Sequence, residues 1–256
     1  MSVESIIAGF LVGFSVGLTG MGGGALLTPV LILFFKLRAS DAIGTSITWM
    51  GMTKLLGGGW HYRLGTVNRQ VARFLCLGGI PGAVLGSAFT AGLSYRFPAY
   101  ADVILVRILA VSLILVAGLM FYQAIFGTVW THNWSGEWMG PRRKPFTIFI
   151  GFLGGLLMGV TSSGTGTLVV VLLAMLYPLG AANIVGSDVL YAAVVTFVAA
   201  MLHAVFRQVE WGLVIPLLIG SLPGIYLGTW LCARLPEKVL RPLLATVIFA
   251  TGVKMV

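Results

Sequence analysis

Two glycine-rich stretches contain the residues that are best suited to hold a small ligand. Residues 17–24 include five glycines and Thr19, and residues 159–166 include three glycines and four hydroxyl side chains. Glycine lets backbone N–H groups approach a ligand closely, and the N–H groups at a helix start attract an anion. We therefore predict an anion site formed by Thr19, Gly22, Gly23, Gly24, Thr161, Ser162, Ser163, Gly164 and Thr165. The alternative is that the glycines only permit close packing and the hydroxyls bond to their own helix.

Each stretch interrupts an apolar segment of membrane-spanning length. Residues 6–35 carry no charge, and a helix needs only about 20 apolar residues to cross a bilayer. Glycine costs about 1 kcal/mol relative to alanine inside a helix, so the cluster predicts a break. In lipid, broken backbone is tolerated only where protein or a water-lined cavity satisfies its polar groups. Two such breaks at matching positions are typical of a transporter's substrate site.

A second group of polar residues lies about one turn inside two later apolar segments. Asp41 and Asn183 are placed to cap the two helices, because side-chain oxygens at a helix start accept from backbone N–H groups. Four residues then remain inside the apolar runs: Thr45, Ser46, Ser187 and Asp188. We also assign Thr45, Ser46 and Ser187 to the predicted anion site. An acid within a membrane segment is costly and is a functional candidate. We read Asp188 as a proton- or cation-coupling residue, with a cap or a counter-ion as the alternative.

Lys54 and two histidines complete the polar side chains of these segments. Lys54 either extends its stem to the membrane interface or faces inward, where it would pair with Asp188 or bind the anion. We favour the inward reading. His61 and His203 sit where a helix leaves the membrane, which predicts a gating role or a proton switch near neutral pH. Two histidines without further ligands do not make a metal site, so we expect neither a metal nor a cofactor.

The composition predicts an all-α polytopic membrane protein. The chain has 256 residues, of which 58% are hydrophobic and 9% are charged, whereas soluble domains carry about 25% charged residues. The apolar runs are continuous and do not alternate as in a β-barrel. The net charge of +9 comes mostly from Lys and Arg at the ends of these runs, where they orient helices, and does not indicate nucleic acid. Cys76 and Cys232 lie inside apolar runs and are expected to be buried thiols.

A shift of 142 residues superimposes the first half of the chain on the second. The matched pairs include Gly17 with Gly159, Gly44 with Gly186, His61 with His203, and Pro81 with Pro223. The sequence therefore predicts two homologous transmembrane halves, residues 1–126 and 145–256, joined by a loop over residues 127–144. Each half has a broken first segment followed by three transmembrane helices.

The relative direction of the halves depends on the broken segments. If each one enters the membrane and returns, the number of crossings per half is odd and the halves are inverted. If each one crosses once, the halves are parallel. Hairpins place nine Lys and Arg residues on one side and five on the other, whereas single crossings give eight and six. The positive-inside rule therefore favours inverted halves.

Signatures of an enzyme are missing from the sequence. The glycines of residues 20–24 are not followed by the Lys-Ser/Thr of a phosphate-binding loop, and His-Glu-x-x-His does not occur. Ser162 and Ser163, which could be paired with His203, are not set in Gly-x-Ser-x-Gly, the motif that marks one class of serine nucleophile. We do not expect an enzyme.

The combined pattern resembles the TauE/SafE sulfite exporter family. It comprises the glycines of residues 17–24, Pro29, residues 42–46, Lys54, His61 and Gly65-x-Val67-Asn68, with a second-half echo in Gly164-x-Gly166 and Pro223-Gly224-x-x-x-Gly228. The resemblance covers nearly the whole chain. It implies a multi-pass carrier in the bacterial inner membrane for a small sulfur-containing anion such as sulfite, a sulfonate, sulfoacetate or thiosulfate. Asp188 departs from the family pattern, in which a threonine-like residue is expected after Gly186-Ser187.

The predicted function is secondary transport by alternating access of one half against the other, with proton coupling as an option. The expected partners are a small anion and the lipid bilayer. The sequence leaves open the exact anion, the direction of transport, the coupling ion and whether the chain forms a homo-oligomer. One alternative is an anion channel that uses the breaks as a filter. Another is a membrane assembly protein that transports nothing.

Overall fold

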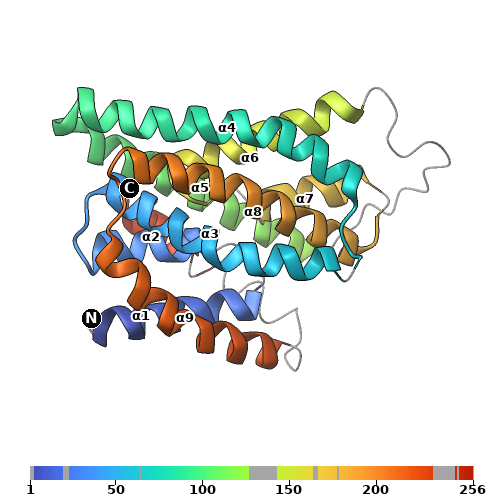
Figure 1. Ribbon diagram of the computed structural model, residues 1–256, viewed down its shortest axis with the longest axis horizontal. Helices are drawn as coiled ribbons and strands as arrows, with labels where there is room; N and C mark the ends of the chain where they lie inside the picture. Colours follow the sequence, from blue (N-terminus) through green and yellow to red (C-terminus); the bar gives the residue numbers. More distant parts are fainter. Residues whose placement is uncertain are drawn as a thin grey trace.

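The computed structural model is all-helical over the residues that it describes (Figure 1). These are residues 3–19, 23–63, 65–126, 143–163, 167–177, 179–232, 246 and 248–255. The labelled helices are α1 (Val3–Thr19), α2 (Gly24–Leu33), α3 (Ala39–Arg63), α4 (Arg69–Arg96), α5 (Pro98–Phe126), α6 (Arg143–Thr161), α7 (Thr167–Leu176), α8 (Ala181–Val205) and α9 (Trp211–Cys232). A further helical stretch covers residues 248–255.

Five of the described helices are long and apolar enough to cross a bilayer. Their apolar spans are Arg69–Arg96, Pro98–Leu119, Arg143–Thr161, Asn183–Val205 and Trp211–Leu231. Large apolar side chains such as Leu77 and Tyr226 are exposed on the outer surface of these helices, which suits contact with lipid. The prediction of an all-α polytopic membrane protein is confirmed.

The helix starts differ in part from the sequence prediction. Asn68 caps α4, because its side-chain oxygen accepts from the N–H groups of Gln70 and Val71 at 3.1 and 3.2 Å. The prediction that Asp41 and Asn183 are caps is wrong. The helix start at Ala39 instead donates its N–H to Asp102 of α5, at 2.9 Å, and α8 has Gly180 as its cap. The N–H group at this helix start is satisfied by a residue of a distant helix, and no local sequence pattern reveals that contact.

Both broken segments turn back on themselves. Phe34 and Phe35, the two residues that follow α2, line a cleft together with Glu4 and Ile7 at the start of α1. In the second half, Tyr177 follows α7 and hydrogen bonds to Thr147 near the start of α6. The pairs α1–α2 and α6–α7 are therefore helical hairpins.

The first helix of each half packs against the fourth helix of the other half. A Cβ atom placed on Gly78 of α4 would come closer than 3.0 Å to the backbone of Ile148 in α6. The matching position in α9, Gly220, meets Ile6 of α1 in the same way. Glycine is needed here because it lets two helix backbones touch. Further pairs repeat the reciprocity: Gly9 with Leu217 and Gly151 with Leu75, Gly82 with Phe152 and Gly224 with Phe10.

Helices α3 and α8, which occupy equivalent places in the two halves, pack against each other in opposite directions. Gly44 near the start of α3 touches His203 near the end of α8, and Gly51 faces Thr196 further back along α8. Figure 1 shows both helices in the middle of the bundle. Among the described residues, they carry the two largest fully buried side chains, Trp49 and Tyr191, which also match by the repeat.

Candidate anion-binding site

A cluster of five buried hydroxyl side chains lies where α6 ends. We call it the hydroxyl cluster, and its members are Thr28 of α2, Ser112 of α5, Thr161 at the end of α6, and Ser162 and Ser163 beyond that end. Ser162 has a left-handed backbone with φ of 62°. This conformation, which a non-glycine residue adopts at a cost, ends the helix and turns the chain.

Hydrogen bonds join the members of the hydroxyl cluster across three elements. The hydroxyl oxygens of Thr28 and Ser162 lie 2.5 Å apart. Ser163 lies 2.8 Å from the Thr161 hydroxyl and 3.0 Å from that of Ser112. Thr161 and Ser112 direct their protons to carbonyl oxygens in their own helices, Leu157 and Leu109. Because hydroxyl groups rotate freely, these O–H groups can turn toward an oxyanion placed among them.

The start of α2 adjoins the hydroxyl cluster. Gly24 packs so closely on the carbonyl group of Ser162 that any side chain would collide with it. The Gly24 N–H donates to the sulfur of Met50 at 3.1 Å, and a thioether is a weak acceptor. The positive end of a helix dipole, an N–H with a weak partner and rotatable hydroxyls suit a small oxyanion.

The described residues bring part of the predicted anion site together. Gly24, Thr161, Ser162 and Ser163 lie at the hydroxyl cluster, and Gly23 precedes α2 as its cap. Thr19 is the last residue of α1. Gly22, Gly164 and Thr165 lie outside the described residues.

Thr45 and Ser187 hold loops of the opposite half. The Thr45 hydroxyl accepts from the backbone N–H of Glu210, after α8, at 2.9 Å. The Ser187 hydroxyl accepts from the backbone N–H of Asn68, after α3, also at 2.9 Å. Ser46 is fully buried, and its hydroxyl has no hydrogen-bond partner among the described residues.

Lys54 and Asp188 lie within electrostatic range of each other. Asp188 is 3% exposed, and Lys54 is partly buried on α3. Tyr191 is also within electrostatic range of Asp188. The electrostatic proximity of Lys54 and Asp188 fits the inward orientation of Lys54, although neither residue belongs to the hydroxyl cluster. The matched positions, Thr196 and Ser46, are uncharged, so the charge pair occurs only once between these helices.

His203 connects the end of α6 to a cavity at one end of the bundle. Its Nε2 lies 3.1 Å from the carbonyl oxygen of Gly159, and its Nδ1 lies 2.8 Å from the Oε1 of Gln208. Gly159 also accepts a hydrogen bond from Thr90 at 3.2 Å. Because a backbone carbonyl oxygen only accepts, Nε2 donates to Gly159. A neutral ring then accepts at Nδ1 from the NH2 group of Gln208, whose amide oxygen and nitrogen can be exchanged by a flip. His61, the matched histidine, lies in α3, and its side chain is not among those described.

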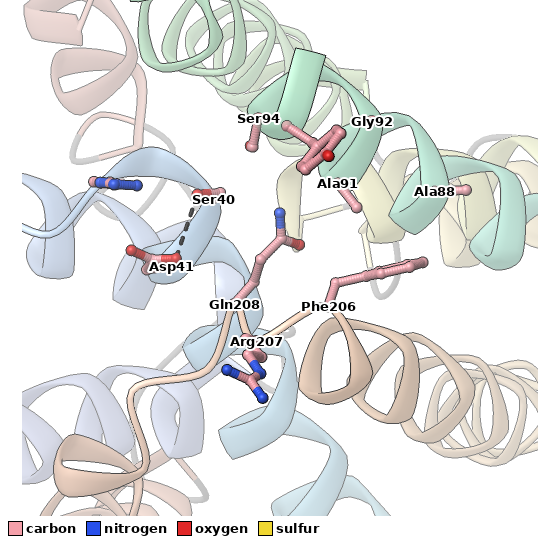
Figure 2. Close-up of a pocket in the computed structure, with 11 residues that line it drawn as sticks. Ser40, Asp41, Ala88, Ala91, Gly92, Ser94, Phe206, Arg207 and Gln208 are labelled. Carbon is pink, nitrogen blue, oxygen red and sulfur yellow. Dashed lines mark hydrogen bonds between the residues drawn. The ribbon is translucent and has the colours of Figure 1, made fainter. Parts of the chain in front are cut away.

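The cavity has a volume of about 500 Å³ and lies between α3, α4 and the loop after α8 (Figure 2). Gln208 reaches into it from that loop, opposite Ser94 and Ala91 of α4, with Ser40 and Asp41 of α3 to one side. The residues that line it are Arg38, Ser40, Asp41, Ala88, Ala91, Gly92, Ser94, Tyr95, Phe206, Arg207 and Gln208.

Sequence reasoning did not single out Thr28, Ser112 or Gln208. The repeat does not mark Thr28, because its counterpart at the 142-residue shift is Val170. Ser112 is a single polar residue whose partner in the cluster, Ser163, lies 51 residues further along the chain. Gln208 lies close to its partner His203 in the chain but belongs to no recognised motif. In the described part of the chain, no three His, Cys, Asp or Glu side chains gather as they would around a metal ion.

Comparisons with known proteins agree with this architecture, which is that of a polytopic helical membrane protein. The sequence profile of the Sulfite exporter TauE/SafE family matches residues 5–255, and the chain belongs to that family. It is 34% identical to the probable membrane transporter protein YjnA of Bacillus subtilis, over the full length of both chains. It is 24% identical to the probable membrane transporter protein YdhB of the same organism, over 92% of each chain. No solved structure matches the chain.

Proposed function

We propose that this membrane transporter is a secondary carrier for a small sulfur-containing anion, such as sulfite, a sulfonate, sulfoacetate or thiosulfate, in the bacterial inner membrane. The observation that carries the proposal is the hydroxyl cluster beside the start of α2. It offers several O–H and N–H donors and no fixed charge, in a buried position between the two hairpins. Tetrahedral and pyramidal oxyanions need donors from several directions, which this cluster supplies.

Alternating access of one half against the other is the proposed mechanism. The opposite directions of α3 and α8 and the two hairpins support halves that are inverted in the membrane. The anion would sit at the breaks, where α2 of the first half meets the end of α6 of the second half. A rocking motion of one half would then expose it first to one side and then to the other.

Asp188 and Lys54 are the proposed coupling pair. Lys54 and Asp188 lie within electrostatic range of each other, and each charge favours the charged form of the other. A proton taken up by Asp188, or an anion placed near Lys54, would change that balance. Transport that consumes a proton gradient would follow from this coupling.

The experiment that tests the proposal is counterflow in proteoliposomes. Vesicles loaded with unlabelled sulfite are diluted into radiolabelled sulfite, and the transient accumulation of label inside is followed. A carrier gives an overshoot, whereas a channel equilibrates without one and an assembly protein gives no uptake above empty vesicles. The assay is repeated with thiosulfate and sulfoacetate to define the substrate.

A further inference from the structure

We propose that the cavity of Figure 2 is a vestibule that collects the anion on one face of the transporter, with Arg207 as the residue that attracts it. The inference rests on the proposed function, because the anion is the substrate proposed there. Here the vestibule means the cavity between α3, α4 and the loop after α8, with the lining residues given above.

The backbone of Arg207 is the first observation. Its φ is 58°, in the left-handed region, which costs a residue with a side chain roughly 1 kcal/mol or more. The matched position at the 142-residue shift is Gly65, whose φ of 69° is nearly the same. The fold therefore needs this turn in both halves, and glycine makes it without strain in one of them. The arginine at position 207 lowers stability and places a charge at the cavity.

The charges around the vestibule are the second observation. Arg38 and Arg207 line it and are exposed, whereas their counterparts, Gly180 and Gly65, are uncharged. Asp41 also lines the cavity and lies within electrostatic range of Arg38, Asp102 and Glu210. Asp102 and Glu210 are not among the lining residues. Within the lining Arg38 and Asp41 offset each other, so Arg207 gives the lining its net positive charge. Of the two equivalent turns, only the one after α8 therefore carries a positive charge.

The path from the vestibule to the breaks is the third observation. Gln208 lines the cavity but is 5% exposed, and it bonds to His203, which bonds to Gly159. Gly159 lies two residues before Thr161 of the hydroxyl cluster. The Ser87 hydroxyl is buried beside Gly159 and has no hydrogen-bond partner among the described residues. Polar groups therefore continue from the cavity to the end of α6, with Gln208 and His203 closing the route.

The topology indicates on which side of the membrane the vestibule opens. It opens where the connections from α2 to α3 and from α8 to α9 lie. In the hairpin arrangement this is the side with the fewer basic residues: Lys36, Arg38, Arg96, Arg207 and Lys254. By the positive-inside rule this side faces away from the cytoplasm. The vestibule therefore receives anions from outside the cell.

The test measures the local field with charged thiol reagents. Cys76 and Cys232 are first replaced by serine, and a single thiol is introduced by Ser94→Cys in the vestibule or by Tyr100→Cys on the exposed start of α5. Each thiol is modified at low salt by an anionic and a cationic methanethiosulfonate. A unit charge about 7 Å away in water changes each rate about threefold, so the anionic-to-cationic ratio should be several-fold higher for Ser94→Cys than for Tyr100→Cys.

Arg207→Gly should abolish that excess in the ratio and raise the melting temperature, because glycine relieves the left-handed backbone. The matched control is Lys36→Gly, since Lys36 also has a left-handed backbone with φ of 56° but does not line the cavity. It should raise the melting temperature and leave the ratio unchanged. A ratio that is the same with Arg207 and with glycine overturns the vestibule.

A second measurement separates this inference from the proposed function. The apparent Kd for sulfite, thiosulfate and sulfoacetate is taken from thermal stabilisation of the parent protein, Arg207→Gly and Lys36→Gly. We expect Arg207→Gly to weaken binding about threefold at low salt, with no change in Lys36→Gly. If none of these anions stabilises the parent protein, the proposed function is contradicted. The reagent ratio still decides whether Arg207 produces a positive potential in the vestibule. Equal Kd values in all three proteins overturn the vestibule alone.

Discussion

The hydroxyl oxygens of Thr28 and Ser162 lie 2.5 Å apart, although 134 residues separate them in the chain. One belongs to the returning helix of the first hairpin and the other to the turn of the second. Their contact brings the two breaks of the duplicated fold to one point. The proposed anion site depends on this meeting of the hairpins.

The hydroxyls of Thr45 and Ser187 should contribute to stability and not to anion affinity. Each accepts from a loop N–H of the opposite half, and a lost hydrogen bond of this kind costs about 1 kcal/mol. Thr45→Val and Ser187→Ala should therefore lower the free energy of unfolding by similar amounts and leave the anion Kd within about twofold. A tenfold change in Kd in either variant would place that hydroxyl in the substrate site.

The glycines at the crossings of α4 with α6 should tolerate no side chain. A methyl group at Gly155 would collide with the backbone of Gly79, and overpacking of this kind costs about 1–3 kcal/mol. Gly155→Ala should therefore lower the melting temperature in detergent. Gly118→Ala in α5 is the control, because nothing lies within 4 Å of its Cβ position. Equal losses in both variants would argue against backbone contact as the cause.

Lys54 and Asp188 should be coupled energetically. Each charge lies within range of the other, and removing one partner of a buried pair typically costs about 3 kcal/mol, because the other charge stays buried. Lys54→Met and Asp188→Asn should each destabilise the protein, and the double variant should lose less than the sum of the two. The double-mutant cycle in chemical unfolding measures this coupling. Strictly additive losses would show that the two charges do not interact.

The sequence predicts the membrane class, the helices and the duplication well. These follow from composition, from apolar runs of membrane length and from glycines such as Gly17 and Gly159 that recur at one spacing. The reciprocal packing of Gly78 and Gly220 is the spatial counterpart of that spacing. A repeat in sequence becomes a repeated contact because equivalent helices meet equivalent partners.

The candidate site could be predicted only in part, because its members come from different elements. Ser162 and Gly24 carry a local signal, since they lie in glycine-rich breaks. Thr28 and Ser112 carry none, because a single hydroxyl in an apolar helix usually bonds to its own backbone. Asp102 of α5, which accepts from the N–H of Ala39 at the start of α3, is likewise placed by tertiary packing. Contacts of this kind depend on how helices pack and not on local pattern.

The measurement that tests the central claim most directly is anion-dependent thermal stabilisation of the Ser162→Gly variant. Glycine removes the hydroxyl and keeps the left-handed backbone of that position. The panel contains sulfite, thiosulfate, sulfoacetate, taurine, sulfate and chloride. The control is Ser15→Ala, which removes a hydroxyl that bonds to its own helix in α1, away from the breaks.

We predict that one sulfur oxyanion stabilises the parent protein and the Ser15→Ala protein equally. In Ser162→Gly its Kd should rise about tenfold, because a hydrogen bond to a charged group contributes about 1.5 kcal/mol or more. An unchanged Kd in Ser162→Gly, or no stabilisation of the parent protein by any anion of the panel, would contradict an anion site at the meeting point of the two hairpins.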